Sequence, residues 1–383
     1  MHIDNISRIL TRGTEEIIEK EHLEKALRSG KKLRVKLGID PTAPDIHLGH
    51  SVVLRKLKQF EDLGHAIVLI IGDFTAQIGD PSGRNETRKQ LSEKEIQKNL
   101  KGYLEQAGKI INIKRAEVRH NSEWHEKGGL KHILSITQSA TVQQILRRDD
   151  FKKRLAEDSE ISMLETLYPI LQGYDSVAVK ADVELGGTDQ KFNLLMGRRV
   201  QRHFGMDEQD ILTVPLIEGI DGVKKMSKSY GNYIGLSETP ENMFGKTMAI
   251  PDTLIKKYFT LLTDIDAPDD IDPYRAKTLL AETITGMYYP NKEAEKAKEQ
   301  WIRTFSKKEN PEDAPKLKIG KKKISLLDLI IKSGVESKSE ARRLITQNAI
   351  QINGTVKEDP NEIISIQESK ILKVGKKKFF KLS

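Results

Sequence analysis

The chain has 383 residues, 37% hydrophobic and 31% charged, which is enough to bury a sizeable core and to form two or three domains. The absence of cysteine excludes disulfide frameworks, thiolate metal sites and thiol catalysis. The first residues are polar and no apolar run reaches the roughly 20 residues of a membrane-spanning helix, so we expect a cytoplasmic protein without membrane contact. The excess positive charge behind the net +8 lies in residues 316–383. This favours a polyanion as the partner of that C-terminal region, and a solvated lysine surface is the alternative.

The first part of the chain alternates short apolar segments with helical patterns. Residues 33–39 and 66–71 predict buried parallel strands, and the helix between them begins near His47 and ends at Gly64. Further along, the pattern predicts a helix over 161–174, a strand over 181–185, a helix over 190–203 and a strand over 211–217. This order indicates an α/β fold with a doubly wound parallel sheet over residues 1–232, and the charged helical stretch 93–160 is interpreted as an insertion between its halves.

Two further parts follow the sheet. Residues 233–315 predict an α-helical domain, with helices over 255–262 and 276–287, and residues 310–323 predict a linker. Residues 316–383 predict that linker and a small α+β module. Its signals are a capping-box spacing at Ser337 before a short helix, and Asn353-Gly354, which suits a type I′ hairpin turn. A basic helix beside short strands resembles the S4 RNA-binding domain, and its candidate RNA contacts are Lys338, Arg342, Arg343 and Lys376.

The first motif that carries chemistry is His47-Leu48-Gly49-His50. Both histidines fall on one face at the start of a helix, just past the carboxyl end of a strand, where open α/β sheets bind ligands. We expect the helix dipole, free backbone N–H groups and both imidazoles to attract phosphate, and Gly49 to leave room for a nucleotide ring. Read alone, the spacing also fits a metal pair or two surface histidines; the preceding Asp-Pro-Thr-Ala-Pro-Asp segment favours the phosphate site.

The second motif is Lys225-Met226-Ser227-Lys228-Ser229, which follows a glycine-rich turn after an apolar strand. Lysines on such a loop are suited to close over a triphosphate and to neutralise the pyrophosphate that leaves. A lysine-rich surface loop without function is the alternative for the motif alone. In this order, the two motifs together predict an ATP site.

Both motifs and the order of strands and helices resemble the class I aminoacyl-tRNA synthetases, and other segments narrow the resemblance to the bacterial-type tyrosyl-tRNA synthetase family. Tyr168, Gln172 and Asp175 lie at i, i+4 and i+7, on one helical face, and match that family's amino-acid pocket. Matches also cover the segments that begin at Gly186, Gly79 and Asn121. The resemblance spans essentially the whole chain, and it implies a Rossmann-type catalytic domain, a helical tRNA-binding domain and an S4 domain.

The family resemblance implies a tyrosine–tRNA ligase that forms tyrosyl-adenylate from L-tyrosine and ATP and then charges tRNA(Tyr). It implies four catalytic residues, which are His47, His50, Lys225 and Lys228. It implies nucleotide contacts at Asp40, Thr42, His47, Gly49, His50, Gly187, Asp189, Lys225, Ser227 and Lys228. It implies tyrosine contacts at Thr75, Asp80, Asn121, Tyr168, Gln172, Asp175 and Gln190, and contacts to phosphate or the tRNA acceptor end at Arg84 and Arg88.

A homodimer formed through the insertion is also implied, with no tightly bound cofactor or resident metal and with Mg²⁺ arriving on ATP. The sequence departs from the family at Lys36, where many relatives have a tyrosine that helps to hold the substrate hydroxyl, so the residue that makes the second contact to that hydroxyl is open.

Three alternatives to this function remain: a tryptophanyl-tRNA synthetase, a non-catalytic synthetase-like RNA-binding protein and a small-molecule nucleotidyltransferase. The face formed by Tyr168, Gln172 and Asp175 and the basic C-terminal module favour the tyrosyl over the tryptophanyl enzyme. Intact motifs argue against a non-catalytic protein, and a nucleotidyltransferase would leave the basic module and the helical domain unexplained.

Overall fold

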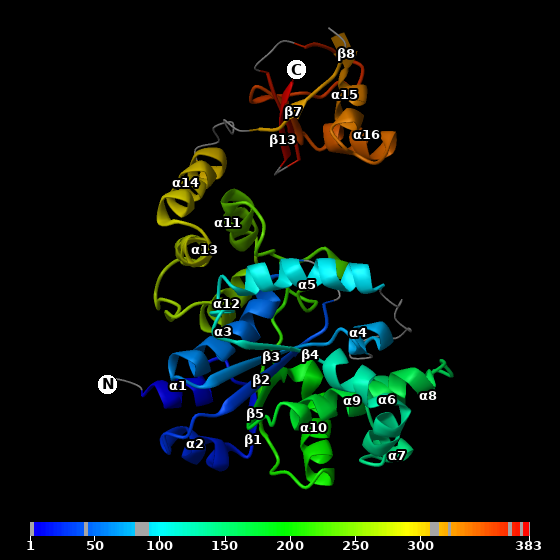
Figure 1. The fold of residues 1–383 in the computed structure, drawn as a ribbon. Coiled ribbons are helices and arrows are strands. Elements are labelled where there is room, and N and C mark those ends of the chain that lie inside the picture. The colour runs from blue at the N-terminus through cyan, green and yellow to red at the C-terminus, as the bar shows by residue number, and fades with distance from the viewer. Residues whose placement is uncertain are drawn as a thin grey trace. The chain divides into compact units, whose positions relative to one another are not determined.

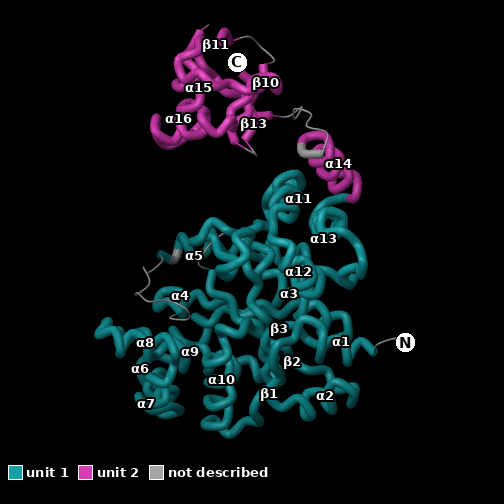
Figure 2. The backbone as a smooth tube through the Cα atoms, turned by 180° about the vertical axis from the view of Figure 1, so that it is seen from behind, with its two compact units in different colours: residues 1–290 teal, residues 291–383 magenta. Residues whose placement is uncertain are grey.

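The computed structural model describes residues 4–41, 45–80, 92–306, 314–320, 323–366, 370–375 and 378–382. The chain forms two compact units, the first unit over 1–290 and the second unit over 291–383 (Figure 2). The finer predicted boundaries at 232 and 315 stay predictions. Among the described residues, no helix has the length and apolar character needed to cross a bilayer.

A six-stranded sheet lies at the centre of the first unit, in the order β1-β6-β5-β2-β3-β4. Its strands are β1 (Glu16–Ile18), β2 (Arg34–Ile39), β3 (Ala66–Ile71), β4 (Glu117–His120), β5 (Val183–Gly187) and β6 (Asp210–Val214). The strands from β6 to β4 pair in parallel, and β1 joins β6 antiparallel. From the central strand β2 the chain passes through β3 and β4 on one side and through β5 and β6 on the other. The predicted doubly wound sheet is confirmed, with its topological switch point between β2 and β5.

Helices cover both faces of this sheet, as Figure 1 shows. On one face α3 (Leu48–Asp62) packs against Val35, Leu37 and Ile39 of β2 through its own Leu54 and Leu57. The opposite face carries α9 (Met163–Ala178) and α10 (Lys191–His203), which pack closely against each other. Alternate residues of β2 therefore face two different layers, and the side chain of Lys36 points toward α9.

Most predicted element positions are confirmed, and the strand predicted over 211–217 is shorter than expected. β6 ends at Val214 because Pro215 has no N–H group with which to continue the ladder. Gly64 has a φ of +86°, as expected where it ends the turn after α3.

The interpretation of 93–160 as a helical insertion was wrong for one segment. This stretch does contain α5 (Glu93–Ala107), α6 (Ser122–Thr137), α7 (Val142–Ile145) and α8 (Asp149–Ala156). It also contains β4, which pairs in parallel with β3 as the edge strand of the central sheet. The strand was missed because its sequence Glu-Val-Arg-His has one apolar residue, and an edge strand needs no continuous apolar run.

The remaining helices of the first unit precede its last strand in sequence or follow it. Before and within the sheet lie α1 (Asn5–Thr11), α2 (Lys20–Arg28), α4 (Thr75–Ile78) and the 3₁₀ turn η1 (Thr188–Gln190). After it come η2 (Lys228–Tyr230), α11 (Pro240–Met248), η3 (Asp252–Leu254), α12 (Ile255–Leu262) and α13 (Pro273–Tyr288). The two predicted helices in this region are confirmed as α12 and α13. Because α12 packs on α3 and Phe259 shares the sheet's hydrophobic core, these helices belong to the first unit.

The second unit has a core of its own. It begins with α14 (Asn291–Trp301) and the π-helical turn η4 (Ile302–Ser306). A sheet in the order β10-β9-β12-β13-β7 and a β11-β8 pair follow, with α15 (Leu326–Lys332) and α16 (Lys338–Thr346). The strands are β7 (Lys316–Leu317), β8 (Lys323–Ser325), β9 (Ile350–Ile352), β10 (Thr355–Val356), β11 (Ile363–Ser365), β12 (Ile371–Val374) and β13 (Lys378–Leu382).

The local signals in the second unit have the expected structures. Ser337 caps α16 by accepting the Glu340 N–H at 3.1 Å, and Asn353 and Gly354 have φ values of 48° and 79°, as a type I′ turn requires. The predicted linker 310–323 was wrong in part, because β7 pairs in parallel with β13 and so joins the sheet.

Candidate active site

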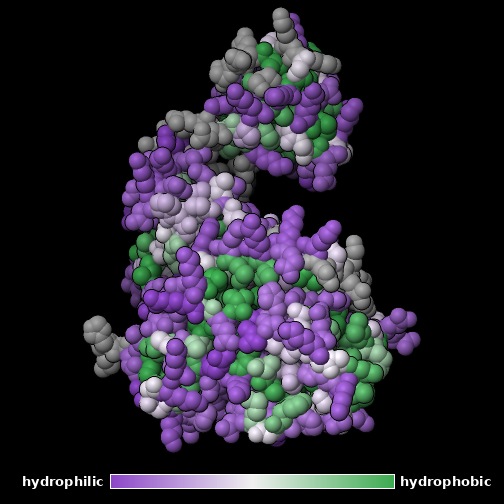
Figure 3. Space-filling model, viewed as in Figure 1, coloured by the Kyte–Doolittle hydropathy of each residue, from purple (hydrophilic) through white to green (hydrophobic). Residues whose placement is uncertain are grey.

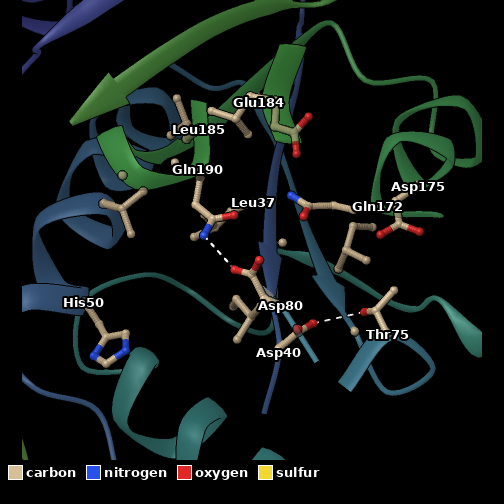
Figure 4. A pocket seen from close by; sticks show the side chains of 18 of the residues that line it. Leu37, Asp40, His50, Thr75, Asp80, Gln172, Asp175, Glu184, Leu185 and Gln190 are labelled. Atoms are coloured by element: carbon tan, nitrogen blue, oxygen red, sulfur yellow. Dashed lines mark hydrogen bonds between the residues drawn. The ribbon is translucent and has the colours of Figure 1, made fainter. Parts of the chain in front are cut away.

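A cavity of about 280 Å³ opens at the carboxyl ends of β2 and β5, at the switch point of the sheet. Nine of the predicted site residues line it: Asp40, His50, Thr75, Asp80, Tyr168, Gln172, Asp175, Gly187 and Gln190. In Figure 4 the imidazole of His50 and the carboxylate of Asp175 lie on opposite sides of this cavity. The structure therefore joins the first motif and the predicted amino-acid pocket in one space.

The carboxylate of Asp175 is held from the start of α6. Its Oδ1 accepts a hydrogen bond from Trp124 Nε1 at 2.9 Å and lies 3.3 Å from His125 Nε2, and its Oδ2 accepts from Asn121 Nδ2 at 3.4 Å. Asp175 and His125 are buried. The roles of Trp124 and His125 were not predicted, since both depend on β4, which delivers the start of α6 to the cavity.

A second network surrounds Asp40, directly after β2. Tyr168 donates its hydroxyl to Asp40 Oδ2 at 2.8 Å, and Thr75 donates to Oδ1 at 3.0 Å, as Figure 4 shows for Thr75. Asn121 Nδ2 also donates to Thr75 Oγ1 at 3.0 Å, which links this network to Asp175. Burial, followed by the nearby Asp40 carboxylate, raises the pKa of Tyr168 well above its usual value, so its hydroxyl stays a donor.

Gly72 is required beside this network. A Cβ at this position would lie 2.0 Å from Asp40 Oδ1 and 2.4 Å from Thr75 Oγ1, which no side chain could occupy without moving both. The close backbone approach thus fixes the place of the Asp40 carboxylate.

Asp80 and Gln190 form a third polar pair in the cavity (Figure 4). Gln190 Nε2 donates to Asp80 Oδ2 at 2.8 Å, and Gln190 Oε1 accepts from Asn193 Nδ2 at 2.9 Å. The guanidinium of Arg148 lies 3.8 Å from Asp80 Oδ1. Asn193 fixes which way the amide of Gln190 points; neither Asn193 nor Arg148 was predicted from the sequence.

The first motif forms the N-terminus of α3, with His47 as its N-cap. Nδ1 of His47 accepts the Gly49 N–H and Nδ1 of His50 accepts the His47 N–H, both at 3.2 Å. An imidazole that accepts through Nδ1 carries its proton on Nε2 when neutral. Burial lowers the pKa of His47 to about 2 and that of His50 to about 4, and the Lys228 charge adds to both shifts. Both rings are therefore neutral donors through Nε2 at physiological pH.

The expectation of free backbone N–H groups at this helix start was wrong. Leu48 donates its N–H to the Ile234 carbonyl at 2.9 Å, His50 donates to the His47 carbonyl at 2.8 Å, and the Gly49 N–H is used by His47. The two imidazoles and a strand-like bridge to Gly235 occupy these groups. Phosphate would have to be met by side chains here.

The two motifs lie next to each other. The segment after the second motif pairs with the first through the bridge between His47 and Gly235, and Leu236 donates its N–H to Ile46 O at 3.0 Å. Met226 is buried in the same hydrophobic core as Leu48. The sequence-based prediction that the intervening chain brings the motifs together is confirmed.

Both lysines of the second motif are held by carboxylates around the first motif and β5. Lys225 Nζ lies 2.9 Å from Asp189 Oδ2, and Lys228 Nζ lies 2.7 Å from Asp45 Oδ2. Ser227 caps η2, and its N–H donates to Asn232 Oδ1 at 2.8 Å. Gly187 lies against Asp189, because a Cβ there would be 2.8 Å from Asp189 Oδ1.

The predicted residues not yet placed fall into two groups. Lys338, Arg342 and Arg343 are exposed on α16, opposite its buried Ala341 and Ile345, and Arg343 pairs with Glu340 at 2.7 Å. Thr42, Arg84, Arg88 and Lys376 lie outside the described residues.

Comparisons with known proteins agree with this geometry. Residues 28–306 match the family described as tRNA synthetases class I (W and Y), and residues 307–382 match the tyrosine–tRNA ligase SYY-like C-terminal domain. The tyrosine–tRNA ligase of Aquifex aeolicus is 50% identical over 382 residues, which cover 98% of this chain and 97% of that protein. That of Thermotoga maritima is 47% identical over 390 residues, covering 98% and 96%.

Solved structures share the fold. A C-terminally truncated mitochondrial tyrosyl-tRNA synthetase from Aspergillus nidulans has a TM-score of 0.67 at 21% identity, covering 79% of this chain and 94% of that one. The Archaeoglobus fulgidus tyrosyl-tRNA synthetase complexed with L-tyrosine has a TM-score of 0.61 at 21% identity, covering 77% and 98%. The family matches, the near-full-length relatives and the cavity that joins the first motif to the predicted amino-acid pocket lead to one conclusion: this chain belongs to the class I aminoacyl-tRNA synthetases, in the tyrosine–tRNA ligase family.

Proposed function

We propose that the cavity activates L-tyrosine with ATP, giving tyrosyl-adenylate and pyrophosphate, and that the tyrosyl group then passes to the 3′ end of tRNA(Tyr). The observation that carries this proposal is the single space that has Asp175 on one side and His50 of the first motif on the other, with Lys228 of the second motif bound to Asp45 beside the first motif. A tyrosine lying between them would present its carboxylate to the nucleotide and its hydroxyl to Asp175.

The pocket side chains fit the two ends of tyrosine. Asp175 would accept the phenolic O–H, and phenylalanine in its place would leave this buried carboxylate without that partner, a difference worth roughly 10⁵-fold in this enzyme family. At the other end, Asp80, Tyr168 and Gln190 would bind the ammonium or orient the carboxylate. Gln172 Oε1 is buried without a hydrogen-bond partner among the described residues, and it supplies a further acceptor on the same face of α9.

The nucleotide would lie between the two motifs. The Nε2–H groups of His47 and His50 are placed to donate to phosphate oxygens, and Gly49 leaves the ring of His47 uncovered. Gly187, Asp189, Asp40 and Thr42 would line the nucleotide, and Lys225, Lys228 and Ser227 would meet the β- and γ-phosphates, with Arg84 and Arg88 toward phosphate or the tRNA acceptor end. Mg²⁺ would arrive bound to ATP.

The proposed chemistry needs no protein nucleophile. An oxygen of the tyrosine carboxylate attacks the α-phosphorus, a P–O bond forms, and the bond to pyrophosphate breaks. A ribose hydroxyl of the tRNA then attacks the acyl carbon and AMP leaves. The protein contributes positioning and donors aimed at the charge that develops on the phosphates.

The test is pyrophosphate exchange with each of the twenty amino acids, with and without tRNA. We expect exchange with tyrosine, exchange with phenylalanine that is weaker by roughly 10⁵-fold, and no requirement for tRNA. Exchange with tryptophan would support the tryptophanyl alternative, and no exchange with any amino acid would support a non-catalytic RNA-binding protein.

We also propose a homodimer that works in the cytoplasm, where ATP and tRNA meet. Large apolar side chains are exposed on α6 to α9: Leu130, Leu134, Val142, Leu155 and Met163. Figure 3 shows hydrophobic atoms interrupting the polar surface on this side of the first unit. A second copy of the chain would cover them. Light scattering after gel filtration should give twice the 43.4 kDa chain mass, and Leu130→Glu should reduce it.

A further inference from the structure

A buried ion pair lies behind the cavity, between the two central strands. Lys36 Nζ lies 2.8 Å from Glu184 Oε1, and the two side chains are 0% and 1% exposed. The residues are direct partners across β2 and β5, and Glu184 also lines the cavity. A fully buried ion pair needs further hydrogen bonds to offset its cost of desolvation. The other hydrogen-bond partners of Lys36 and Glu184 therefore identify the segments that the pair connects.

All three protons of the Lys36 ammonium are donated within the protein. Besides Glu184, they reach Ser176 Oγ at 2.9 Å and the Gln172 carbonyl at 3.3 Å. Ser176 in turn donates to Glu184 Oε2 at 3.2 Å, and Gln209 Nε2 donates to the same oxygen. Since an ammonium has three donors, Lys36 has none to offer to a substrate hydroxyl.

Two of these contacts hold α9 on both sides of Asp175. Gln172 comes three residues before Asp175 and Ser176 comes one residue after it, so Lys36 binds the turn of α9 that carries the pocket carboxylate. The same part of α9 meets α10 closely, where a Cβ on Gly173 would lie 2.7 Å from Val200 Cγ2 and a Cβ on Gly197 would lie 3.1 Å from Ser176 Oγ. A fully satisfied buried polar network beside this close helix contact makes this part of α9 rigid.

We propose that Lys36 is a positioning residue for tyrosine recognition, one that never touches the substrate. Through Gln172 and Ser176 it fixes the turn of α9 so that Asp175 and Gln172 face the cavity correctly. The hydroxyl is read by Asp175 alone, supported by Trp124, His125 and Asn121, without a second contact from β2. This inference rests on the proposed tyrosine-activating function.

The test compares the exchange kinetics of tyrosine and phenylalanine in a variant that lacks both charges. Lys36→Met alone would leave Glu184 buried and unpaired, so the double variant K36M/E184Q is used. A loss of positioning should lower kcat/KM for tyrosine on the order of tenfold or more, the worth of one or two hydrogen bonds to a charged group. Phenylalanine should lose activity as well, because Gln172 serves both substrates, while the KM for ATP and the melting midpoint stay near wild type.

Two comparison variants complete the experiment. Lys31→Met removes an exposed ion pair to Asp182, just before the same two strands, and should leave all kinetic values unchanged. Ser176→Ala removes one acceptor of Lys36 without creating a buried charge, so it should show a smaller loss for both amino acids. If the double variant does not fold, the kinetics of Ser176→Ala with both amino acids serve as the test instead.

Two results would overturn the proposal. A folded double variant with wild-type kinetics for both amino acids would make the ion pair purely structural. A rise in the KM for ATP as large as the loss for tyrosine would show a general disturbance of the site and not positioning of α9. Failure of the proposed function is distinguishable, since the wild-type enzyme would then show no tyrosine-dependent exchange.

Discussion

The ammonium of Lys228 lies 2.7 Å from the carboxylate of Asp45, two residues before the histidine that caps α3. This ion pair joins the second motif to the first across the mouth of the proposed nucleotide site. The pair places the Lys228 charge within reach of His47 and His50, whose pKa values it helps to lower. Lys228 is thus already aimed at the region where the phosphates would lie.

Lys228→Ala should therefore depress adenylate formation much more than tyrosine binding. A cation that stabilises the leaving pyrophosphate acts mainly in the transition state, and loss of one such group costs on the order of 10²–10³-fold in rate. Single-turnover adenylate formation gives the rate and equilibrium dialysis gives the tyrosine affinity. Equal losses in both measurements would contradict this role.

Asp45→Asn should act in the opposite direction on ATP. Removing the carboxylate frees Lys228 for the phosphates, and a partly exposed pair of this kind is worth up to about 1 kcal/mol, or roughly fivefold. The KM for ATP in the exchange reaction should fall by up to that factor, with the KM for tyrosine unchanged. A rise in the KM for ATP would instead give Asp45 a direct part in binding Mg-ATP.

Trp124→Phe should weaken tyrosine recognition. The variant removes the shortest hydrogen bond to Asp175 and keeps an aromatic ring in place. A hydrogen bond to a charged group contributes about 1.5–3 kcal/mol, so the KM for tyrosine should rise on the order of tenfold or more. The matched control is Trp301→Phe at the chain's other tryptophan, in the second unit, which should leave this KM unchanged. An unaltered KM in Trp124→Phe would mean that Asp175 needs no donor from α6.

Local sequence patterns predict most of the strands and helices, but they do not predict which side chains contact each other in the site. Ala66–Ile71 and Ile255–Leu262 have the predicted bounds because each has a clear apolar pattern. β4 was missed because an edge strand can be polar, and with it were missed Trp124 and His125, which reach Asp175 only through that strand. The partners of Lys36 and Lys228 are more than a hundred residues away in sequence, and no local pattern encodes such pairs.

The neutral histidines of the first motif predict a defined loss of stability in acid. In the unfolded chain both have a pKa near 6.5, whereas burial lowers the folded values to about 2 for His47 and about 4 for His50. As the pH falls below 6.5 the unfolded chain binds protons that the folded chain does not, so stability decreases, and the His50 contribution levels off below about pH 4. Each histidine adds at most about 1.4 kcal/mol per pH unit. Urea unfolding at pH 7, 6 and 5 measures this slope, and His50→Gln should make it shallower. An unchanged slope in that variant would mean that His50 is protonated in the folded enzyme.

The exposed basic residues of α16 predict a separate effect on tRNA. Arg342→Glu and Lys338→Glu should raise the KM for tRNA in aminoacylation and leave the tRNA-independent exchange unchanged, because α16 belongs to the second unit and the cavity to the first. If each residue neutralises one phosphate, each variant should also reduce the slope of log KM against log salt by about one. Lys25→Glu, an equally exposed lysine on α2, is the matched control for a general charge effect. If Lys25→Glu raises the KM for tRNA by the same factor, the effect of the α16 variants would reflect nonspecific attraction between charges and not a contact at α16. A normal KM for tRNA in both α16 variants would place RNA contact on another surface of the second unit.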